Sequence, residues 1–371
     1  MDFVQELISR YYKDANIEVD AIANREFGFG SKEKKIETRH YAFPNIDSLR
    51  KFLVENAPYY VSYSTSYYKY PSARPMEKKE RFATELVFDL DVTDMNLSCQ
   101  KIHGKDWVCE NCLYEVKREA IKLVEDFLIN DFGFSKDEIE INFSGYRGYH
   151  IHVKSKEALE LDQEARKEIS DYITANNLDF DKIFYIKNGR LVGPKPNDFG
   201  WYSKIAKSIL DALQDYNKLV SLGINPRIAK KLYEKKELVE MGIKNGNWDM
   251  VAISKKEEFW KRLISNLSIK QSDKIDANVT IDPTHLIRMP NTIHGGSGLI
   301  AKKFSFNEID KFDPMKDAIA FKDGDLRVYA NTKFPLIMND ETFGPYNGEE
   351  VTIPKYAALY LYLKGLAEIK N

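Results

Sequence analysis

The clearest strand signal in the chain spans residues 85–92, which read Glu85-Leu86-Val87-Phe88-Asp89-Leu90-Asp91-Val92. From Leu86 onward every second side chain is apolar, so one face of this strand packs on a core while the other carries Asp89 and Asp91. Two carboxylates lying side by side repel each other, and burying them is costly unless a cation binds. Their oxygens suit Mg²⁺ or Mn²⁺, and a pair of such ions can serve phosphoryl transfer. The alternative is a strand face exposed to solvent.

A hairpin is predicted over residues 139–153. Apolar side chains alternate through both strands, and the turn between them reads Ser144-Gly145-Tyr146-Arg147-Gly148. The opposite face of the second strand carries His150 and His152. The glycines let the backbone approach a ligand closely, and Ser144, Arg147 and His150 offer groups that suit phosphate oxygens. The alternative is an ordinary glycine-containing turn with a surface arginine.

Two more strands are predicted, at 278–282 and 298–303. Asp282 ends the first of them, opposite its apolar side chains, and is a candidate third carboxylate. Arg288 and His294 lie near a glycine-rich turn, where they add positive charge for a polyphosphate. For each of these residues alone, a surface charge is the alternative.

All three cysteines of the chain lie within residues 99–112, together with one of its six histidines. Cys99, His103, Cys109 and Cys112 are four ligands at short spacing that close with a C-x2-C pair, which matches a tetrahedral zinc site. We predict structural zinc, because four protein ligands leave no open position for water. A redox C-x2-C pair is the alternative, but it leaves Cys99 and His103 unexplained.

The composition is that of a globular protein, with 43% hydrophobic and 30% charged residues among 371. Its 55 Lys and Arg nearly balance its 57 Asp and Glu, giving a net charge of −2. That balance argues against coating nucleic acid by bulk charge, although it permits a local basic groove. The odd, low number of cysteines argues against a disulfide framework. No targeting segment and no apolar run long enough for a bilayer are visible, so we predict an intracellular protein with no membrane partner.

The character of the sequence changes between residues 155 and 276, where it is rich in Lys and Glu, with helical spacing and few strand signals. We therefore predict an α+β protein in which 1–154 and 277–371 form one sheet domain and 155–276 is an inserted helical subdomain. A last helix is predicted over 356–369.

Taken together, the motifs resemble the small, catalytic subunit of archaeal and eukaryotic DNA primases. The main segments, in order, are ELVFDLDVTD at 85–94, the Cys/His cluster, FSGYRGYHIHV at 143–153 and VTIDPTHLIRMPNTIHGGSGLIAKK at 279–303. REFGF at 25–29 and PSARPM at 71–76 are also similar. The resemblance implies a primase fold, with a mixed β-sheet core flanked by helices, a zinc knuckle at 99–112 and a variable helical subdomain.

The same resemblance implies synthesis of short RNA primers from nucleoside triphosphates on single-stranded DNA, by two-metal-ion nucleotidyl transfer. The residues that match the family's metal-binding aspartates are Asp89, Asp91 and Asp282. Those that match its triphosphate-binding residues are Ser144, Arg147, His150, Arg288 and His294. Relatives often carry a basic or polar residue where this chain has Tyr146. The implied partner is a primase large subunit, and the implied location is the cytoplasm of an archaeon or the nucleus of a eukaryote.

Two other functions fit the same motifs. A stand-alone primase-polymerase of the same superfamily would start chains without a large subunit. A zinc-bearing nucleic-acid-binding protein without catalysis would be indifferent to the loss of Asp89.

Overall fold

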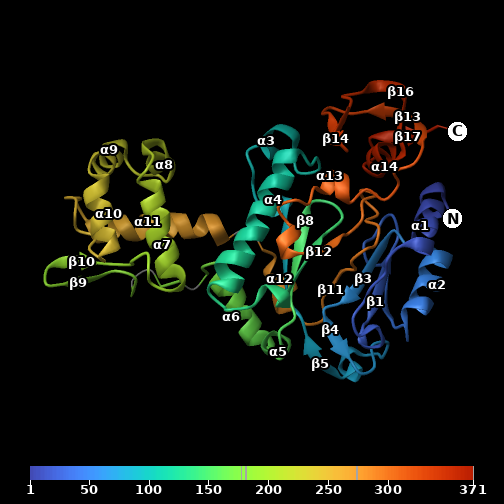
Figure 1. Cartoon of the computed structure of the whole chain (residues 1–371), viewed down its shortest axis with the longest axis horizontal. Helices are drawn as coiled ribbons and strands as arrows, with labels where there is room; N and C mark the ends of the chain where they lie inside the picture. Colours follow the sequence, from blue (N-terminus) through green and yellow to red (C-terminus); the bar gives the residue numbers. More distant parts are fainter. Residues whose placement is uncertain (177, 180–181, 273–274, 371) are drawn as a thin grey trace. The chain divides into compact units, whose positions relative to one another are not determined.

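The computed structural model describes residues 1–176, 178–179, 182–272 and 275–370 (Figure 1). Contacts divide the chain into two compact units. The large unit comprises Met1–Val124, Phe134–Lys167 and Ile275–Asn371, and the small unit comprises Glu125–Gly133 and Glu168–Lys274. Helices and strands are both present, so the chain is of the α+β class, as predicted. Of the predicted helical insertion, residues 177, 180–181 and 273–274 lie outside the described residues.

Two four-stranded sheets form the body of the large unit. In the first sheet the strands lie in the order β11 (Leu286–Arg288), β3 (Tyr60–Ser64), β1 (Phe27–Gly30) and β2 (Thr38–Tyr41). In the second sheet the order is β12 (Lys303–Ser305), β7 (Ile139–Phe143), β8 (Gly148–Val153) and β6 (Leu86–Asp91). Where the resemblance implies a mixed sheet, every ladder in these two sheets is antiparallel. One reason is the short turn between β7 and β8, which permits only antiparallel pairing.

Helices cover an apolar face of each sheet. On the first sheet lie α1 (Phe3–Asp14) and α2 (Ile46–Asn56), which share one core with Phe27 and Val61. The second sheet is covered by α4 (Glu110–Lys122), which contacts β6 and β8. This arrangement leaves the other face of β6 and β8 free to carry polar groups.

The alternation that predicted β6 is present in the structure. Leu86, Phe88 and Leu90 are buried, whereas Asp89 and Asp91 are half-buried. The predicted hairpin at 139–153 is also present, as β7 and β8. Strand β8 pairs with β6 on its other side, so that Asp89 lies opposite His150 and Asp91 opposite Gly148.

The strand predicted at 278–282 is wrong, because this segment forms the helix α12 (Ala277–Ile281). The side chain of Asp276 accepts a hydrogen bond from the amide of Asn278 and caps the helix, which outweighs the apolar alternation in the sequence. The strand predicted at 298–303 is displaced, since β12 begins only at its last residue.

The last predicted helix ends early. Helix α14 spans Lys355–Leu363, and Gly365, with a φ of +71°, then turns the chain into a strand. That strand is β17 (Ala367–Ile369). It pairs with β13 (Asp325–Asn331), which pairs on its other side with β16 (Asn347–Pro354), so the three form one sheet.

The small unit is mainly helical and has its own core, which includes Ile209, Ile243, Trp248 and Trp260. Its helices are α7 (Gly200–Ala212), α8 (Tyr216–Ser221), α9 (Pro226–Glu234), α10 (Lys236–Lys244) and α11 (Lys256–Ser272). Its hairpin pairs β9 (Tyr185–Lys187) with β10 (Arg190–Val192). Helix α6 (Gln163–Ile173) begins in the large unit and ends in the small one.

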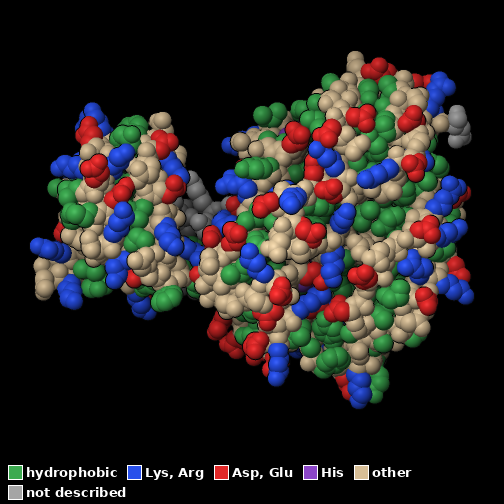
Figure 2. All heavy atoms as spheres, viewed as in Figure 1, with side chains coloured by type: hydrophobic (Ala, Val, Ile, Leu, Met, Phe, Trp, Pro, Cys, Tyr) green, Lys and Arg blue, Asp and Glu red, His purple; other side chains and the backbone are tan. Residues whose placement is uncertain are grey.

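The remaining elements are short. The short strands are β4 (Ser66–Tyr68), β5 (Arg81–Thr84), β14 (Leu336–Met338) and β15 (Glu341–Phe343). The short α-helices are α3 (Gln100–His103), α5 (Lys156–Leu159) and α13 (Pro314–Asp317), and α4 continues as a π-helix over Leu123–Ile129. Figure 2 shows acidic and basic side chains interspersed over the visible face, in keeping with the near-neutral net charge. Among the helices described, none is both long and apolar enough to cross a bilayer.

Candidate nucleotide and metal site

A cavity of about 620 Å³ lies in the large unit where the polar face of β6 and β8 meets β3 and β11. Of the eight residues predicted to bind the catalytic metal ions or the nucleotide, all but Asp282 line it. Its other polar lining residues were not predicted: Lys35, Tyr60, Ser62, Asp106, Tyr146, Asp276, His285 and Lys364.

Three carboxylates approach one another on one side of the cavity. Asp89 and Asp91 come from β6, and Asp276 joins them from the start of α12, where its backbone amide donates to the carbonyl of Asp89 at 3.0 Å. Burial, followed by repulsion from Asp91 and Asp276, raises the pKa of Asp89 to about 7. A buried carboxylate that is hard to ionise beside two others has the character of a divalent-cation site, and oxygen donors suit Mg²⁺ or Mn²⁺.

Asp282 is not brought into this cluster. It follows α12 instead of ending a strand, and its Oδ1 accepts hydrogen bonds from the amide and the hydroxyl of Thr284, both at 2.8 Å. Asp276, six residues earlier, takes the position for which Asp282 was the candidate. The sequence held one signal for this, because Asp276 precedes a short segment that can be capped as a helix.

The turn between β7 and β8 brings Arg147 to the carboxylates. Gly145 has a φ of +84°, and a Cβ built there would lie 2.7 Å from the Cβ of His294, so the turn admits only glycine. The hydroxyl of Ser144 accepts from the amide of Gly148 at 3.1 Å, which closes the turn. The Nε of Arg147 then lies 2.9 Å from the Oδ1 of Asp91. Burial opposes its charge, but this ion pair raises the pKa of Arg147.

The other side of the cavity holds buried nitrogen groups, of which only His150 has a carboxylate within 4 Å among the described residues. Burial lowers the pKa of His150 and of His294 well below the ordinary value, and lowers that of Arg288 to about 10. Arg288 donates to the carbonyl of Val61 at 3.0 Å and lies over the ring of Tyr60, while its Nε has no partner among the described residues. Buried donors of this kind, left unpaired, favour an anionic ligand.

The histidines have defined surroundings. The Nδ1 of His294 accepts from the amide of Gly296 at 3.2 Å, so the neutral ring carries its proton on Nε2. The Nε2 of His150 lies 3.7 Å from the Oδ1 of Asp89, and its Nδ1 has no partner in the described part of the chain. Both imidazoles therefore have a nitrogen available for a ligand.

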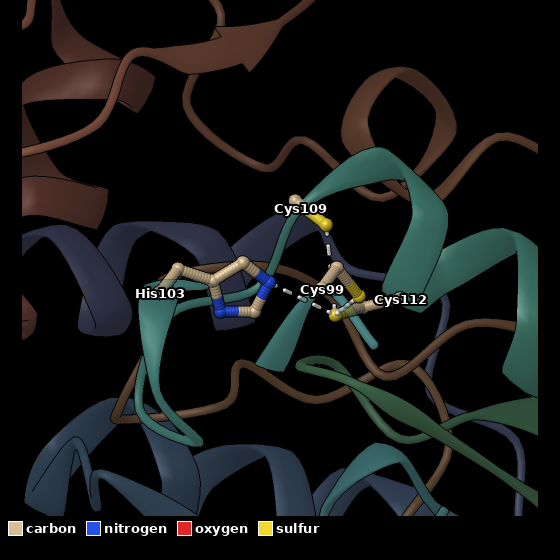
Figure 3. Close-up of side chains that lie close together, drawn as sticks. All are labelled: Cys99, His103, Cys109 and Cys112. Carbon is tan, nitrogen blue, oxygen red and sulfur yellow. Dashed lines mark hydrogen bonds between the residues drawn. The ribbon is translucent and has the colours of Figure 1, made fainter. Parts of the chain in front are cut away.

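The Cys/His cluster is assembled as predicted (Figure 3). Cys99 and His103 flank α3, and Cys109 and Cys112 lie at the start of α4; one ligand atom from each lies within 4.8 Å of the others. The sulfur of Cys112 is 3.5 Å from that of Cys99 and 3.7 Å from that of Cys109. A tetrahedron with Zn–S bonds of about 2.3 Å has edges of about 3.8 Å, so the spacing fits a structural zinc site.

The histidine of this cluster is oriented for metal binding. Its Nε2 lies 3.5 Å from the sulfur of Cys112, and its Nδ1 contacts the carbonyl of Gly104 at 2.7 Å. A backbone partner on Nδ1 fixes the tautomer that leaves Nε2 free as a ligand. The convergence of all four side chains favours metal over a redox pair formed by Cys109 and Cys112 alone.

Comparison with known proteins gives a consistent result. A family model of the DNA primase small subunit matches residues 88–306. The chain is 33% identical to the DNA primase small subunit PriS of Methanosarcina barkeri, over 99% of this chain and 96% of that protein. It is 34% identical to the PriS protein of Picrophilus torridus, over 95% and 94% of the two chains, and 32% identical to that of Methanocaldococcus jannaschii, over 97% and 95%. The chain therefore belongs to the DNA primase small subunit family, of the archaeal type.

Proposed function

We propose that this chain is the catalytic subunit of a DNA primase with the primase fold, which makes short RNA primers from nucleoside triphosphates on single-stranded DNA. The observation that carries the proposal is one cavity of about 620 Å³ that joins three carboxylates to a set of buried nitrogen donors. A nucleotidyl transfer needs both halves, since metal ions and a polyphosphate meet at the reacting phosphorus.

The carboxylates Asp89, Asp91 and Asp276 are the proposed metal ligands, with Asp276 in place of Asp282. Bound there, Mg²⁺ or Mn²⁺ lowers the pKa of the attacking 3′-hydroxyl and neutralises charge on the triphosphate. Arg147 already pairs with Asp91 at 2.9 Å, so it lies at the border between the metal ligands and the phosphate-binding groups. Its guanidinium can turn a second edge to a phosphate oxygen.

The proposed triphosphate-binding residues are Ser144, Arg147, His150, Arg288 and His294. They hold the triphosphate in line with the attacking oxygen, which is the main task of the protein in phosphoryl transfer. The N–H at Nε2 of His294 and the free Nε of Arg288 donate to phosphate oxygens without first breaking another hydrogen bond. Because no existing hydrogen bond has to be broken, this geometry supports the assignment of His294 and Arg288 to triphosphate binding.

Two further proposals concern zinc and the partner. The Cys₃His cluster binds structural zinc and fixes the segment 99–112. A primase large subunit completes the enzyme by helping to hold the template and the first nucleotide. The near-neutral charge of this chain supports that dependence, because phosphate binding by charge alone needs an excess of cations.

The test is primer synthesis from ATP on a poly-dT template, by the chain alone and with its large subunit. We expect Asp89→Ala to abolish synthesis and Asp323→Ala, which removes an exposed aspartate outside the cavity, to leave it unchanged. Full activity of a folded Asp89→Ala protein would exclude catalysis at this cavity. Equal de novo synthesis with and without the large subunit would favour a stand-alone primase-polymerase.

A further inference from the structure

A lysine from the end of the chain enters the nucleotide cavity. Lys364 directly follows α14, far in sequence from the β7–β8 turn, yet its Nζ lies 3.2 Å from the centroid of the Tyr146 ring. The cavity is lined by both residues. Neither was among the residues that the sequence predicted for nucleotide binding.

Several nitrogen-bearing side chains lie around the Tyr146 ring. The guanidinium of Arg147 lies 4.8 Å from its centroid, and the ring of His294 lies 5.5 Å away, tilted by 37°. The Tyr146 hydroxyl donates to the carbonyl of Asp106 at 3.0 Å, which fixes the ring in this position. The ring is thus a platform that holds Lys364 beside two of the proposed triphosphate-binding residues.

Lys364 lacks a direct ion-pair partner among the described residues. Within the described part of the chain it forms no ion pair and no side-chain hydrogen bond, and its only close partners are aromatic rings. Burial, and then the nearby guanidinium of Arg147, lowers the pKa of Lys364 to about 7, although Asp106 and Asp91 act in the opposite direction. A half-buried ammonium kept beside an arginine, with no carboxylate at ion-pair distance among the described residues, costs free energy that an anionic ligand would recover.

A second lysine of the same segment shows the ordinary arrangement. Lys370 lies 5.5 Å from the ring centroid of Tyr329 but also pairs with Glu368 at 3.6 Å, and it is outside the cavity. Contact with a tyrosine ring is common to both lysines. What distinguishes Lys364 is the lack of a direct ion pair with any described carboxylate and the position inside the cavity.

We propose that Lys364 binds the polyphosphate of the incoming nucleoside triphosphate, and that Tyr146 positions its ammonium group for this contact. The proposal rests on the proposed function of the cavity. It adds a cation from the C-terminal segment to those supplied by the β7–β8 turn and by the segment around β11.

The test is steady-state primer synthesis by the full enzyme, with tripolyphosphate and AMP as inhibitors. A charged hydrogen bond contributes about 1.5–3 kcal/mol, so we expect Lys364→Gln to raise the KM for ATP at least about tenfold, with little change in kcat. Inhibition by tripolyphosphate should weaken by the same factor, whereas inhibition by AMP should not. Lys364→Arg should restore most of the affinity, and Lys370→Gln is the matched control with a wild-type KM.

Tyr146 is tested as a positioning residue. Tyr146→Phe keeps the ring but loses the hydrogen bond to Asp106, so it should raise KM less than Tyr146→Leu, which should raise KM toward that of Lys364→Gln without adding to it in the double variant. A folded Lys364→Gln protein with unchanged KM and unchanged tripolyphosphate inhibition would overturn the proposal. If Asp89→Ala abolishes synthesis in the same assay, that failure concerns Lys364 alone and not the proposed function.

Discussion

At the residue scale, the most informative group is the carboxyl of Asp89. Its pKa is raised from an ordinary value near 4 to about 7 by burial and by the carboxylates of Asp91 and Asp276. The folded protein therefore holds a proton that the unfolded chain has lost between those two pH values. Because stability falls with pH wherever the folded state binds more protons, ionised Asp89 destabilises the metal-free protein as pH rises through this window.

We expect Asp89→Asn to melt at a temperature several degrees above the wild type at a pH of about 7.5, without added Mg²⁺ or Mn²⁺. The gain should shrink near pH 5, where Asp89 is already protonated. Added Mn²⁺ should stabilise the wild type more than the variant. Differential scanning calorimetry measures all three effects, with Asp323→Asn as the control. A variant that melts below the wild type at the higher pH would contradict the role given to burial and repulsion.

The second residue-scale prediction separates Asp276 from Asp282. Asparagine is as good a helix N-cap as aspartate, so Asp276→Asn should leave α12 intact while it removes a carboxylate from the cavity. We expect primer synthesis to fall by about two to three orders of magnitude, as when one electrostatic group is removed from an active site. Asp282→Asn keeps an acceptor for Thr284 and should remain within about twofold of the wild type. Comparable losses in both variants would restore Asp282 as a candidate.

At the element scale, the predicted zinc knuckle supports the β7–β8 turn. The segment between its ligands offers two backbone carbonyls to that turn: Arg147 donates to the carbonyl of Lys105 at 3.2 Å, and Tyr146 to that of Asp106 at 3.0 Å. A structural metal fixes the backbone that carries it. Zinc bound by this cluster would therefore contribute to the position of two cavity residues, although the cluster holds no reacting group.

We expect Cys109→Ser to lose zinc, to melt at a lower temperature and to raise the KM for ATP, with kcat affected less. Zinc content by atomic spectroscopy, calorimetry and initial rates measure these effects. Cys109→His, which keeps a four-ligand set, should retain zinc and most of the affinity. A zinc-free protein with the wild-type KM would show that the position of Arg147 and Tyr146 does not depend, through these two hydrogen bonds, on an ordered knuckle.

The elements that the sequence predicted well are those with long, regular patterns. Strand β6 and the β7–β8 hairpin follow from alternation over five or six residues in each strand, and the Cys/His spacing alone predicted which four side chains converge. Helix α12 is only five residues long, and the spacing of Val279 and Ile281 within it fits the two-residue period of a strand. The N-cap at Asp276 makes this segment a helix instead of a strand. Because the segment is a helix, Asp276 and not Asp282 joins Asp89 and Asp91 at the cavity.

At the scale of the whole molecule, a net charge of −2 coexists with a cavity that is lined by both aspartates and Lys or Arg side chains. We expect the chain alone to bind a labelled oligo-dT weakly, and the complex with its large subunit to bind at least about tenfold more tightly, with a steeper salt dependence. Fluorescence anisotropy at low and moderate salt measures both. Equal affinity and equal salt dependence would mean that this chain carries the template site by itself.

The boundary between the two units differs from the one that the sequence suggested. The sequence placed the change at residue 155, but the first part of the predicted insertion belongs to the large unit. The reason is visible at Arg166, a buried residue whose guanidinium donates to the carbonyls of Thr84 and Glu85, next to β6. A buried arginine in a segment rich in charged residues looks like any surface arginine until its acceptors are known.

The cavity draws on residues from Lys35 to Lys364, and strand β11 pairs with β3 across more than two hundred residues. This has a consequence for biosynthesis. A ribosome adds about 5–20 residues per second, so the carboxylates of β6 emerge many seconds before Asp276 and Lys364 do. During that interval the nascent chain carries mutually repelling carboxylates without the cationic wall that faces them. The nucleotide pocket can close only after the small unit has been made, so its completion is one of the last steps of folding on the ribosome.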